Sequence, residues 1–204
     1  MSVTREPAPL NWRLLLWWVL ATAIGFSVGG PIEAVLGRSS GILVIVYVSA
    51  GGTAAAVLQW LALRRHVSQA GWWVGTGIVG GVVAGAVGVA VGVSAGVTTG
   101  VIEGLADGAA KGMEAGIDAG VDAAGVTMAV VFGAAVGVVQ WLMLRLHVAG
   151  AGWWVLASGV GWVVSGFAAG VTDTAAGWAV LGAVYGAITG SVLVWLLRQR
   201  LGAG

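Results

Sequence analysis

Residues 88–120 read GVAVGVSAGVTTGVIEGLADGAAKGMEAGIDAG, with glycine at every fourth position: Gly88, Gly92, Gly96, Gly100, Gly104, Gly108, Gly112, Gly116 and Gly120. Four residues turn an α-helix through about 400°, so these glycines form one stripe along a helix. A stripe without side chains lets another helix approach closely, which is how helices are held together in lipid. The stretch therefore predicts closely packed helices.

A flexible linker is the alternative interpretation of so many glycines. Val, Ile, Leu and Met recur between the glycines, however, and flexible linkers are typically built from glycine and serine. Nine glycines would cost a water-exposed helix about 7–9 kcal/mol relative to alanine. We therefore expect helices whose glycine stripe is covered by a partner helix.

The composition is that of an integral membrane protein. Hydrophobic residues make up 59% of the 204 residues and charged residues 8%, and the mean hydropathy is +0.99. Six apolar stretches are long enough to predict membrane-spanning helices. They are Trp12–Gly29, Gly41–Leu63, Gly71–Gly92, Val126–Leu146, Gly152–Val171 and Gly177–Leu197.

An internal repeat groups these spans into hairpins. The string VLQWLALRRHVSQAGWWV, which starts at Val57, returns 81 positions later as VVQWLMLRLHVAGAGWWV. The C-terminal string SVLVWLLRQRL aligns as a partial third copy. In it Trp195 and Arg198 correspond to the Trp and Arg of the first two copies, and Val194 stands where they have glutamine. The predicted fold is an all-α membrane protein of six helices in three repeated hairpins.

We predict one membrane domain, residues 1–204, with repeats at about 12–66, 71–147 and 152–201. The middle hairpin is the longest, because the glycine-rich segment 85–125 lies within it, and we expect its tip near Ala109–Met113. This segment either protrudes from the membrane or folds back along it. The repeat also makes the first apolar run a retained helix and not a cleaved leader.

Basic residues predict the orientation. Arg5, Arg13, Arg64, Arg65, Arg145, Arg198 and Arg200 fall on one side of the six predicted spans, whereas Arg38 and Lys111 fall on the other. The positive-inside rule then places both termini in the cytoplasm. We expect a multipass protein of the bacterial inner membrane.

Tryptophans gather at the same ends of the spans as the arginines. We interpret them as anchors at the lipid headgroups, where tryptophan is enriched. The repeated anchors are Trp60, Trp72, Trp73, Trp141, Trp153 and Trp154. Membrane lipid is therefore an expected partner.

Two pairs of polar residues recur in the repeat. Gln59 and Gln140 lie in the last turns of predicted spans, where we expect them to form hydrogen bonds between helices. His66 and His147 could ligate a metal or a tetrapyrrole. A solvated histidine at the membrane surface is the favoured interpretation, because the third repeat lacks a histidine and a metal would recruit further ligands.

Acidic residues flank the predicted tip of the long hairpin at i, i+4 spacing. Glu103 and Asp107 share one helix face, and Glu114, Asp118 and Asp122 share another. The favoured interpretation is a solvated face. A site for a cation or a basic partner is the alternative, although no calcium-binding loop sequence is present.

No pattern indicates catalysis or a cofactor. The chain has no cysteine, no nucleophile elbow, no phosphate-binding loop and no metalloprotease motif, so we predict neither an enzyme nor a cofactor. A net charge of +1 with only nine Lys and Arg also argues against nucleic-acid binding.

The QWLxLRxH and GWWV motifs resemble those of uncharacterised bacterial multipass membrane proteins, and the glycine ladder resembles the glycine-zipper segments of many bacterial membrane proteins. Neither resemblance implies an activity. The sequence favours a non-enzymatic protein that acts through helix packing, as a homo-oligomer or as an accessory subunit of a larger membrane complex. A channel or small-solute transporter with a glycine-lined path is the alternative, and a pigment- or haem-associated subunit is the third.

Overall fold

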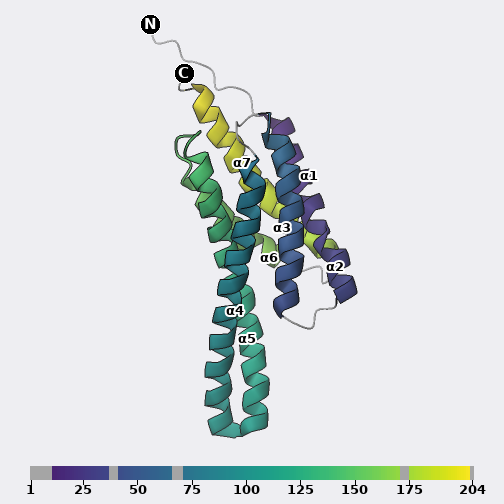
Figure 1. The fold of residues 1–204 in the computed structure, drawn as a ribbon, viewed down its shortest axis with the longest axis vertical. Helices are drawn as coiled ribbons and strands as arrows, with labels where there is room; N and C mark the ends of the chain where they lie inside the picture. Colours follow the sequence, from purple (N-terminus) through teal and green to yellow (C-terminus); the bar gives the residue numbers. More distant parts are fainter. Residues whose placement is uncertain (1–10, 37–40, 66–70, 171–174, 203–204) are drawn as a thin grey trace.

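A computed structural model describes residues 11–36, 41–65, 71–170 and 175–202, which are almost entirely α-helical (Figure 1). In chain order the helices are α1 (Trp12–Ser27), α2 (Gly29–Leu36), α3 (Gly41–Leu63), α4 (Trp72–Asp107), α5 (Ala109–Leu144), α6 (Trp153–Gly170) and α7 (Ala175–Gly202). The all-helical part of the sequence prediction is confirmed.

Six of the helices close into a ring. Each helix of the sequence α1, α3, α4, α5, α6, α7 packs against the next, and α7 packs against α1. The short helix α2 follows α1 after a break at Val28 and packs against α3 and α7. The ring therefore consists of three pairs of helices, α1 with α3, α4 with α5 and α6 with α7, around one central axis.

Three helical segments are long and apolar enough to cross a membrane: Trp12–Ile32, Val89–Asp107 and Ala176–Gln199. Three shorter apolar helices accompany them, at Trp72–Val83, Val130–Leu144 and Trp153–Ala169. The structure therefore supports a multipass membrane protein. The candidate span Val89–Asp107 lies in the glycine ladder and extends beyond the predicted span Gly71–Gly92.

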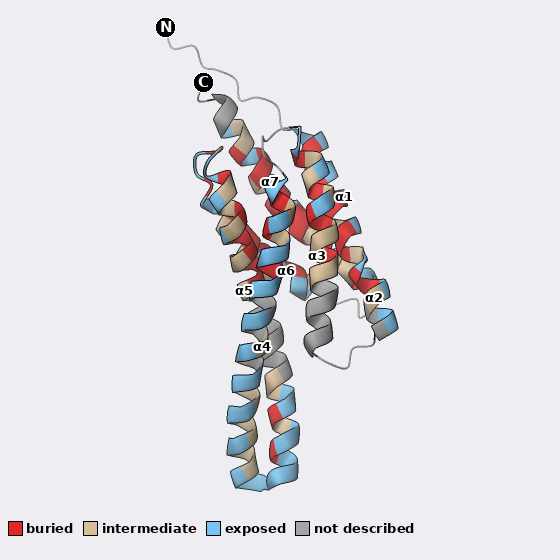
Figure 2. Cartoon of the chain, viewed as in Figure 1, coloured by how far each residue is buried: buried red, intermediate tan, exposed pale blue. Residues whose placement is uncertain are grey.

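Helices α4 and α5 form a hairpin of 36 residues in each arm, about 54 Å of helix per arm. Its lower half extends beyond the other helices and is mostly exposed, whereas the buried residues gather in the upper bundle (Figure 2). The turn is the single residue Gly108 at φ +99°. The turn falls one residue before the predicted tip near Ala109–Met113, since Ala109 already begins α5 and Gly108 adopts the left-handed backbone that glycine favours.

Glycines bring the two arms into backbone contact. A Cβ on Gly96 would lie 2.8 Å from the carbonyl oxygen of Gly116, and a Cβ on Gly100 would lie 3.0 Å from that of Gly112. Backbone cannot move aside as a flexible side chain can. The close approach of α4 and α5 therefore requires glycine at these positions.

The other ladder glycines differ in their surroundings. Gly104 lies opposite Gly112, and Gly120 lies opposite Gly96. Gly108 makes the turn and a Cβ there would meet nothing within 4 Å. Gly88 and Gly92 lie within α4, at positions whose surroundings fall outside the described part of the chain.

Replacing Gly116 by Ala should destabilise the protein, because the new Cβ would lie 2.7 Å from the carbonyl oxygen of Gly96 and 2.9 Å from the Cα of Gly100. Gly75→Ala is the matched control on the same hairpin, since a Cβ there meets nothing within 4 Å and alanine favours helix by about 1 kcal/mol. Unfolding in detergent, followed by circular dichroism, should show a lower midpoint for Gly116→Ala only. Equal midpoints for the two variants would contradict the close packing.

Candidate functional site

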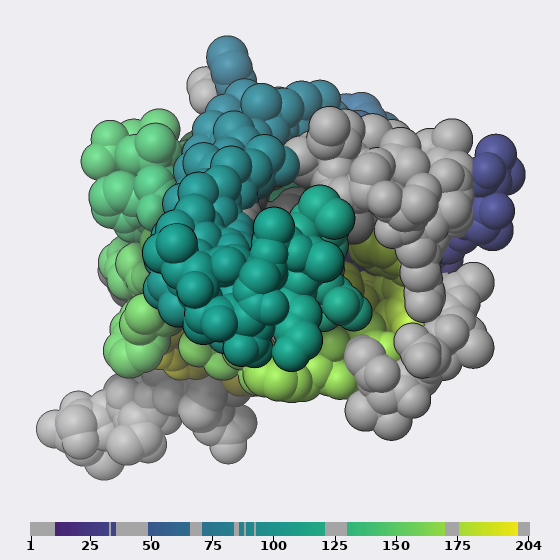
Figure 3. Space-filling model, turned by 90° about the horizontal axis from the view of Figure 1, so that it is seen from below, coloured from purple at the N-terminus to yellow at the C-terminus, as the bar shows by residue number. Residues whose placement is uncertain are grey.

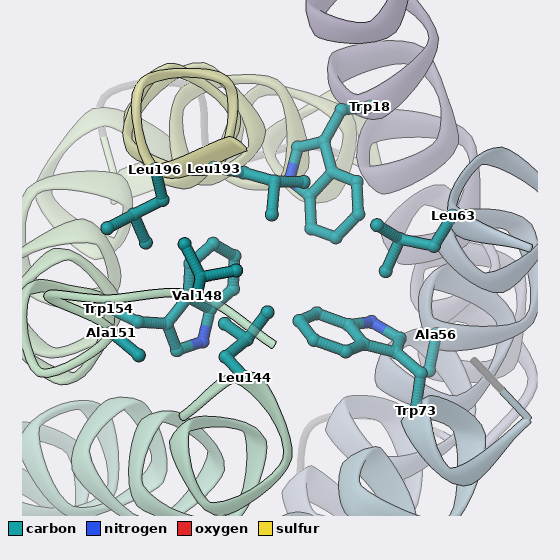
Figure 4. Packing of buried hydrophobic residues seen from close by; sticks show 10 residues of the cluster. All are labelled: Trp18, Ala56, Leu63, Trp73, Leu144, Val148, Ala151, Trp154, Leu193 and Leu196. Atoms are coloured by element: carbon teal, nitrogen blue, oxygen red, sulfur yellow. The ribbon is translucent and has the colours of Figure 1, made fainter. Parts of the chain in front are cut away.

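Three tryptophans meet on the axis of the ring (Figure 4). Trp18, Trp73 and Trp154, which we call the tryptophan hub, come from α1, α4 and α6 and are at most 1% exposed. Their ring centroids lie 5.4–6.0 Å apart, and all three pairs meet edge to face. Such pairs each contribute about 0.5–1.5 kcal/mol beyond the burial of their area. The hub fills the axis at this level.

Each hub tryptophan also donates a hydrogen bond to the preceding hairpin. The Nε1 of Trp73 donates to Oε1 of Gln59 on α3 at 2.9 Å, and the Nε1 of Trp154 donates to Oε1 of Gln140 on α5 at 2.9 Å. The third bond closes the ring, because Trp18 Nε1 donates to Thr189 Oγ1 on α7 at 3.1 Å. Every hairpin is thereby tied to the next at a buried site.

Thr189, and not Val194, occupies the place of the glutamine in the third hairpin. Gly25, Gly80 and Gly161 each stand seven residues after a hub tryptophan, and a side chain on them would collide with Ala55, Val136 and Tyr185, respectively. Four residues beyond those three partners come Gln59, Gln140 and Thr189. The alignment of Val194 with the glutamines, made on the adjacent Trp195, was therefore wrong by five residues.

The correct register also explains the rest of the hub. Leu63, Leu144 and Leu193 each follow the hydrogen-bond acceptor by four residues, and all three are at most 1% exposed. They belong to the same buried cluster as the three indoles. One turn of helix thus separates the polar ring of acceptors from an apolar ring of leucines.

A second aromatic cluster fills the axis on the side of the hub nearer the hairpin tip. Phe26, Phe132, Trp162 and Tyr185 pack there, with ring centroids 4.3–6.4 Å apart. The Oη of Tyr185 shares a hydrogen bond of 2.8 Å with the hydroxyl of Ser158. Between the two clusters lies a small cavity, which includes Gln59, Gln140 and Gly77 in its wall.

The prediction that all six repeated tryptophans are lipid anchors was wrong for two of them. Trp73 and Trp154 are 1% exposed and form the hub, whereas their neighbours Trp72 and Trp153 are 71% and 58% exposed. In a WW pair on a helix, adjacent side chains point about 100° apart, so only one can face outward. The two adjacent tryptophans in each WW motif were therefore a sequence signal that one of them is buried.

Trp60 and Trp141 lie half-buried at the ends of α3 and α5. The guanidinium of Arg64 stands 5.6 Å from the ring centroid of Trp60, and that of Arg145 stands 5.2 Å from that of Trp141. Each arginine thus packs on the tryptophan four residues before it, and this cation–π contact recurs in both repeat copies.

Of the two histidines considered as metal ligands, only His147 lies among the described residues. His147 is half-buried, and its Nδ1 lies 3.1 Å from the carbonyl oxygen of Met143. His66 lies outside the described residues. Within the described ranges, no three His, Cys, Asp or Glu side chains come together as metal ligands would.

The acidic residues lie along the projecting half of the hairpin. Asp107, Glu114 and Asp118 are exposed and Glu103 is half-buried. Asp107 lies 3.6 Å from Lys111 across the turn. Asp122 lies in α5, but its side chain is outside the described part. These exposed groups form a solvated surface and do not converge on one point.

An apolar groove runs beside these acids on the same half of the hairpin. It is about 500 Å³ in volume and is lined by Val97, Gly100, Val101, Gly104, Leu105, Ala109, Gly112 and Met113. We call it the hairpin groove. Its floor is glycine, and its rims are the strongly exposed side chains of Val97 (61%), Leu105 (85%) and Met113 (68%). Figure 3 shows this end of the hairpin, in teal, projecting toward the viewer.

Comparisons of this chain with protein families, with curated proteins and with solved structures find no match.

Replacing Gln59 by Leu should destabilise the protein by about 1–3 kcal/mol, because the buried Trp73 N–H would lose its acceptor. The double variant with Trp73→Phe removes both partners, so its destabilisation should be smaller than the sum of the two single changes by about 1 kcal/mol. Detergent unfolding followed by circular dichroism measures all three. The pair Gln59→Leu with Trp153→Phe is the control and should be additive, because exposed Trp153 lies outside the hub; equal coupling in both pairs would refute the hydrogen bond.

Proposed function

We propose that this chain is a non-enzymatic multipass membrane protein whose helical ring serves as an anchor and whose projecting α4–α5 hairpin docks a second copy of the chain. The observation that supports this most directly is the hairpin groove, a glycine-floored apolar surface without any charged residue in its wall. In this proposal the ring anchors the chain in the bilayer, and the hairpin binds the second copy.

Charge supports placing the ring, and not the hairpin tip, in the membrane. The candidate span Val89–Asp107 runs beside the part of α5 that carries Glu114 and Asp118, so both arms would have to enter the bilayer together. An acidic side chain at the bilayer centre costs about 2.5–3.5 kcal/mol. Among the side chains that the structure describes, no acidic residue is buried in the ring. The tip half of the hairpin therefore belongs in water.

An apolar groove in water favours a partner that covers it. Val97, Val101 and Leu105 form one exposed ridge on α4, and Met113 and Ile117 form the facing ridge on α5. Contiguous apolar surfaces of this kind mark protein-binding sites on soluble surfaces. The glycines between the ridges, half-buried Gly100 and Gly104 and buried Gly112, already pack α4 against α5, so the exposed ridges supply the contact surface.

A second copy of this chain is the occupant that matches the groove. The partner needs an apolar ridge of the same length on a helix that stands parallel to the hairpin. Another hairpin, inserted in the same membrane with the same orientation, supplies that ridge from Val97, Val101 and Leu105. The contact is self-complementary about a twofold axis and produces a four-helix bundle. Acidic Asp107, Glu114 and Asp118 line no part of the groove, so they need not meet across it.

The arginines support the orientation. Arg13, Arg64, Arg65 and Arg145 stand at the hub end of the ring, opposite Lys111 at the hairpin tip (Figure 1). The positive-inside rule then places the hub end and both termini in the cytoplasm of a bacterial cell and the tip outside the inner membrane. Because the chain lacks cysteine, Ala110→Cys can be labelled alone. We expect a membrane-impermeant maleimide to label this cysteine in intact spheroplasts. If the cysteine reacts only after the spheroplasts are lysed, the tip lies in the cytoplasm and the proposed orientation is wrong.

The filled axis weighs against the channel alternative. A solute path along the ring would have to pass the tryptophan hub and then the cluster of Phe26, Phe132, Trp162 and Tyr185, both of which are buried and tightly packed. No observation on the described residues favours a pigment or haem over a simple protein core. We therefore propose neither a channel nor a pigment- or haem-associated subunit.

Leu105→Glu should dissociate the oligomer, because a carboxylate would enter the apolar groove contact. Leu105 is 85% exposed within one chain, so the change should leave the fold of the monomer intact. Ala106→Glu is the matched control, since it adds the same charge at the neighbouring exposed position outside the groove. Native mass spectrometry from mild detergent should give monomer for Leu105→Glu and the wild-type oligomer for Ala106→Glu. Retention of the oligomer by both would exclude the groove as the interface.

A further inference from the structure

The cavity between the two axial clusters is lined mostly by apolar residues, among which Gln59, Gln140, Trp162 and Tyr185 carry polar groups. It measures about 20 Å³, and we call it the axial cavity; its wall includes Gly77, Phe132, Gln140, Trp162 and Tyr185. A site needs at least about 10–15 Å³ to hold one water molecule. The axial cavity therefore has room for one water and for no larger ligand.

Gln59 and Gln140 occupy equivalent places but have unequal partners. Both accept a hydrogen bond from a hub tryptophan through Oε1. Gln59 also donates through Nε2 to the hydroxyl of Thr22 at 2.9 Å. The Nε2 of Gln140 has no acceptor among the described residues, although the side chain is only 3% exposed. Gln59 thus bonds through both ends of its amide, whereas Gln140 bonds only through its oxygen.

The repeat explains this difference. Thr22 stands four residues after Trp18, and the residue four positions after Trp73 is Gly77. Glycine has no side chain with which to accept the amide proton. The missing threonine side chain leaves both an unpaired donor and space in the same cavity wall.

A second unpaired donor lines the same cavity. The Nε1 of Trp162 is buried and has no hydrogen-bond partner among the described residues. A buried polar group without a partner costs about 1–3 kcal/mol, and ordered water is the usual partner where protein groups supply none. The ligand of this cavity must therefore be a hydrogen-bond acceptor.

We propose that the axial cavity holds one ordered water molecule, which accepts a hydrogen bond from Nε2 of Gln140 in the place of the hydroxyl that Thr22 offers to Gln59. The water completes the ring of hydrogen bonds at the one hairpin whose own residues cannot. It belongs to the cavity beside the hub, away from the hairpin groove, and so does not depend on oligomerisation.

The test uses the four glutamines of the chain, Gln59, Gln69, Gln140 and Gln199, as internal probes. The full-length protein is labelled with ¹⁵N in its glutamine side chains and placed in detergent micelles. The variants Gln69→Ala, Gln199→Ala and Gln140→Leu assign the amide resonances. A rotating-frame cross-peak to a long-lived water is expected at the amide protons of Gln140, and it should be stronger than any at Gln59, which lines the same cavity but whose Nε2 donates to Thr22. Absence of this cross-peak at Gln140 would overturn the proposal.

Gly77→Ser and Gly77→Ala test whether the amide of Gln140 needs an acceptor at this position. Both add a Cβ, which would lie 3.0 Å from the Cβ of Ala56, but only serine adds an acceptor for Gln140. Both should remove the water cross-peak, and Gly77→Ser should unfold at the higher detergent concentration because it replaces the lost hydrogen bond. Equal or greater stability of Gly77→Ala would show that the amide of Gln140 needs no acceptor at this position and would contradict the proposal.

Discussion

The hydrogen bond from a buried indole to the preceding hairpin is the interaction on which the ring depends. Hairpins in lipid have little hydrophobic reason to associate, so their order must be set by packing and by polar contacts. Trp18, Trp73 and Trp154 supply both, because each ring packs against the other two and each N–H has one acceptor. The bond from Trp18 to Thr189 is the most consequential, since it joins the first hairpin to the last and closes the ring.

Glycine serves two different purposes in the two halves of the molecule. Around the hub, Gly25, Gly80 and Gly161 allow the two helices of each hairpin to meet, and large side chains fill the axis beside them. Along the projecting hairpin, glycines meet glycines, so α4 and α5 pack without any large side chain between them. The apolar side chains of this half consequently face outward, which is why a single chain leaves a groove that a second chain can fill.

Sequence patterns predicted the apolar helices, because these depend on local composition and spacing. They did not predict the hub. Composition suggests that tryptophans near helix ends face lipid, and only the pairing of Trp72 with Trp73 and of Trp153 with Trp154 hints that one of each pair turns inward. The register of the third hairpin was also missed, since Trp195 resembles Trp60 and Trp141 more than Thr189 resembles a glutamine. The hairpin groove follows from the pairing of two helices and has no signature in either helix alone.

The central claim is that the ring anchors the chain and the hairpin assembles it with copies of itself. The most direct test is the mass of the complex extracted from its native membrane in polymer-bounded lipid discs, without detergent. The chain is 20.3 kDa, and the account predicts a particle whose protein mass is an even multiple of that value with no other polypeptide. A particle that contains one copy, alone or with foreign subunits, would contradict the account.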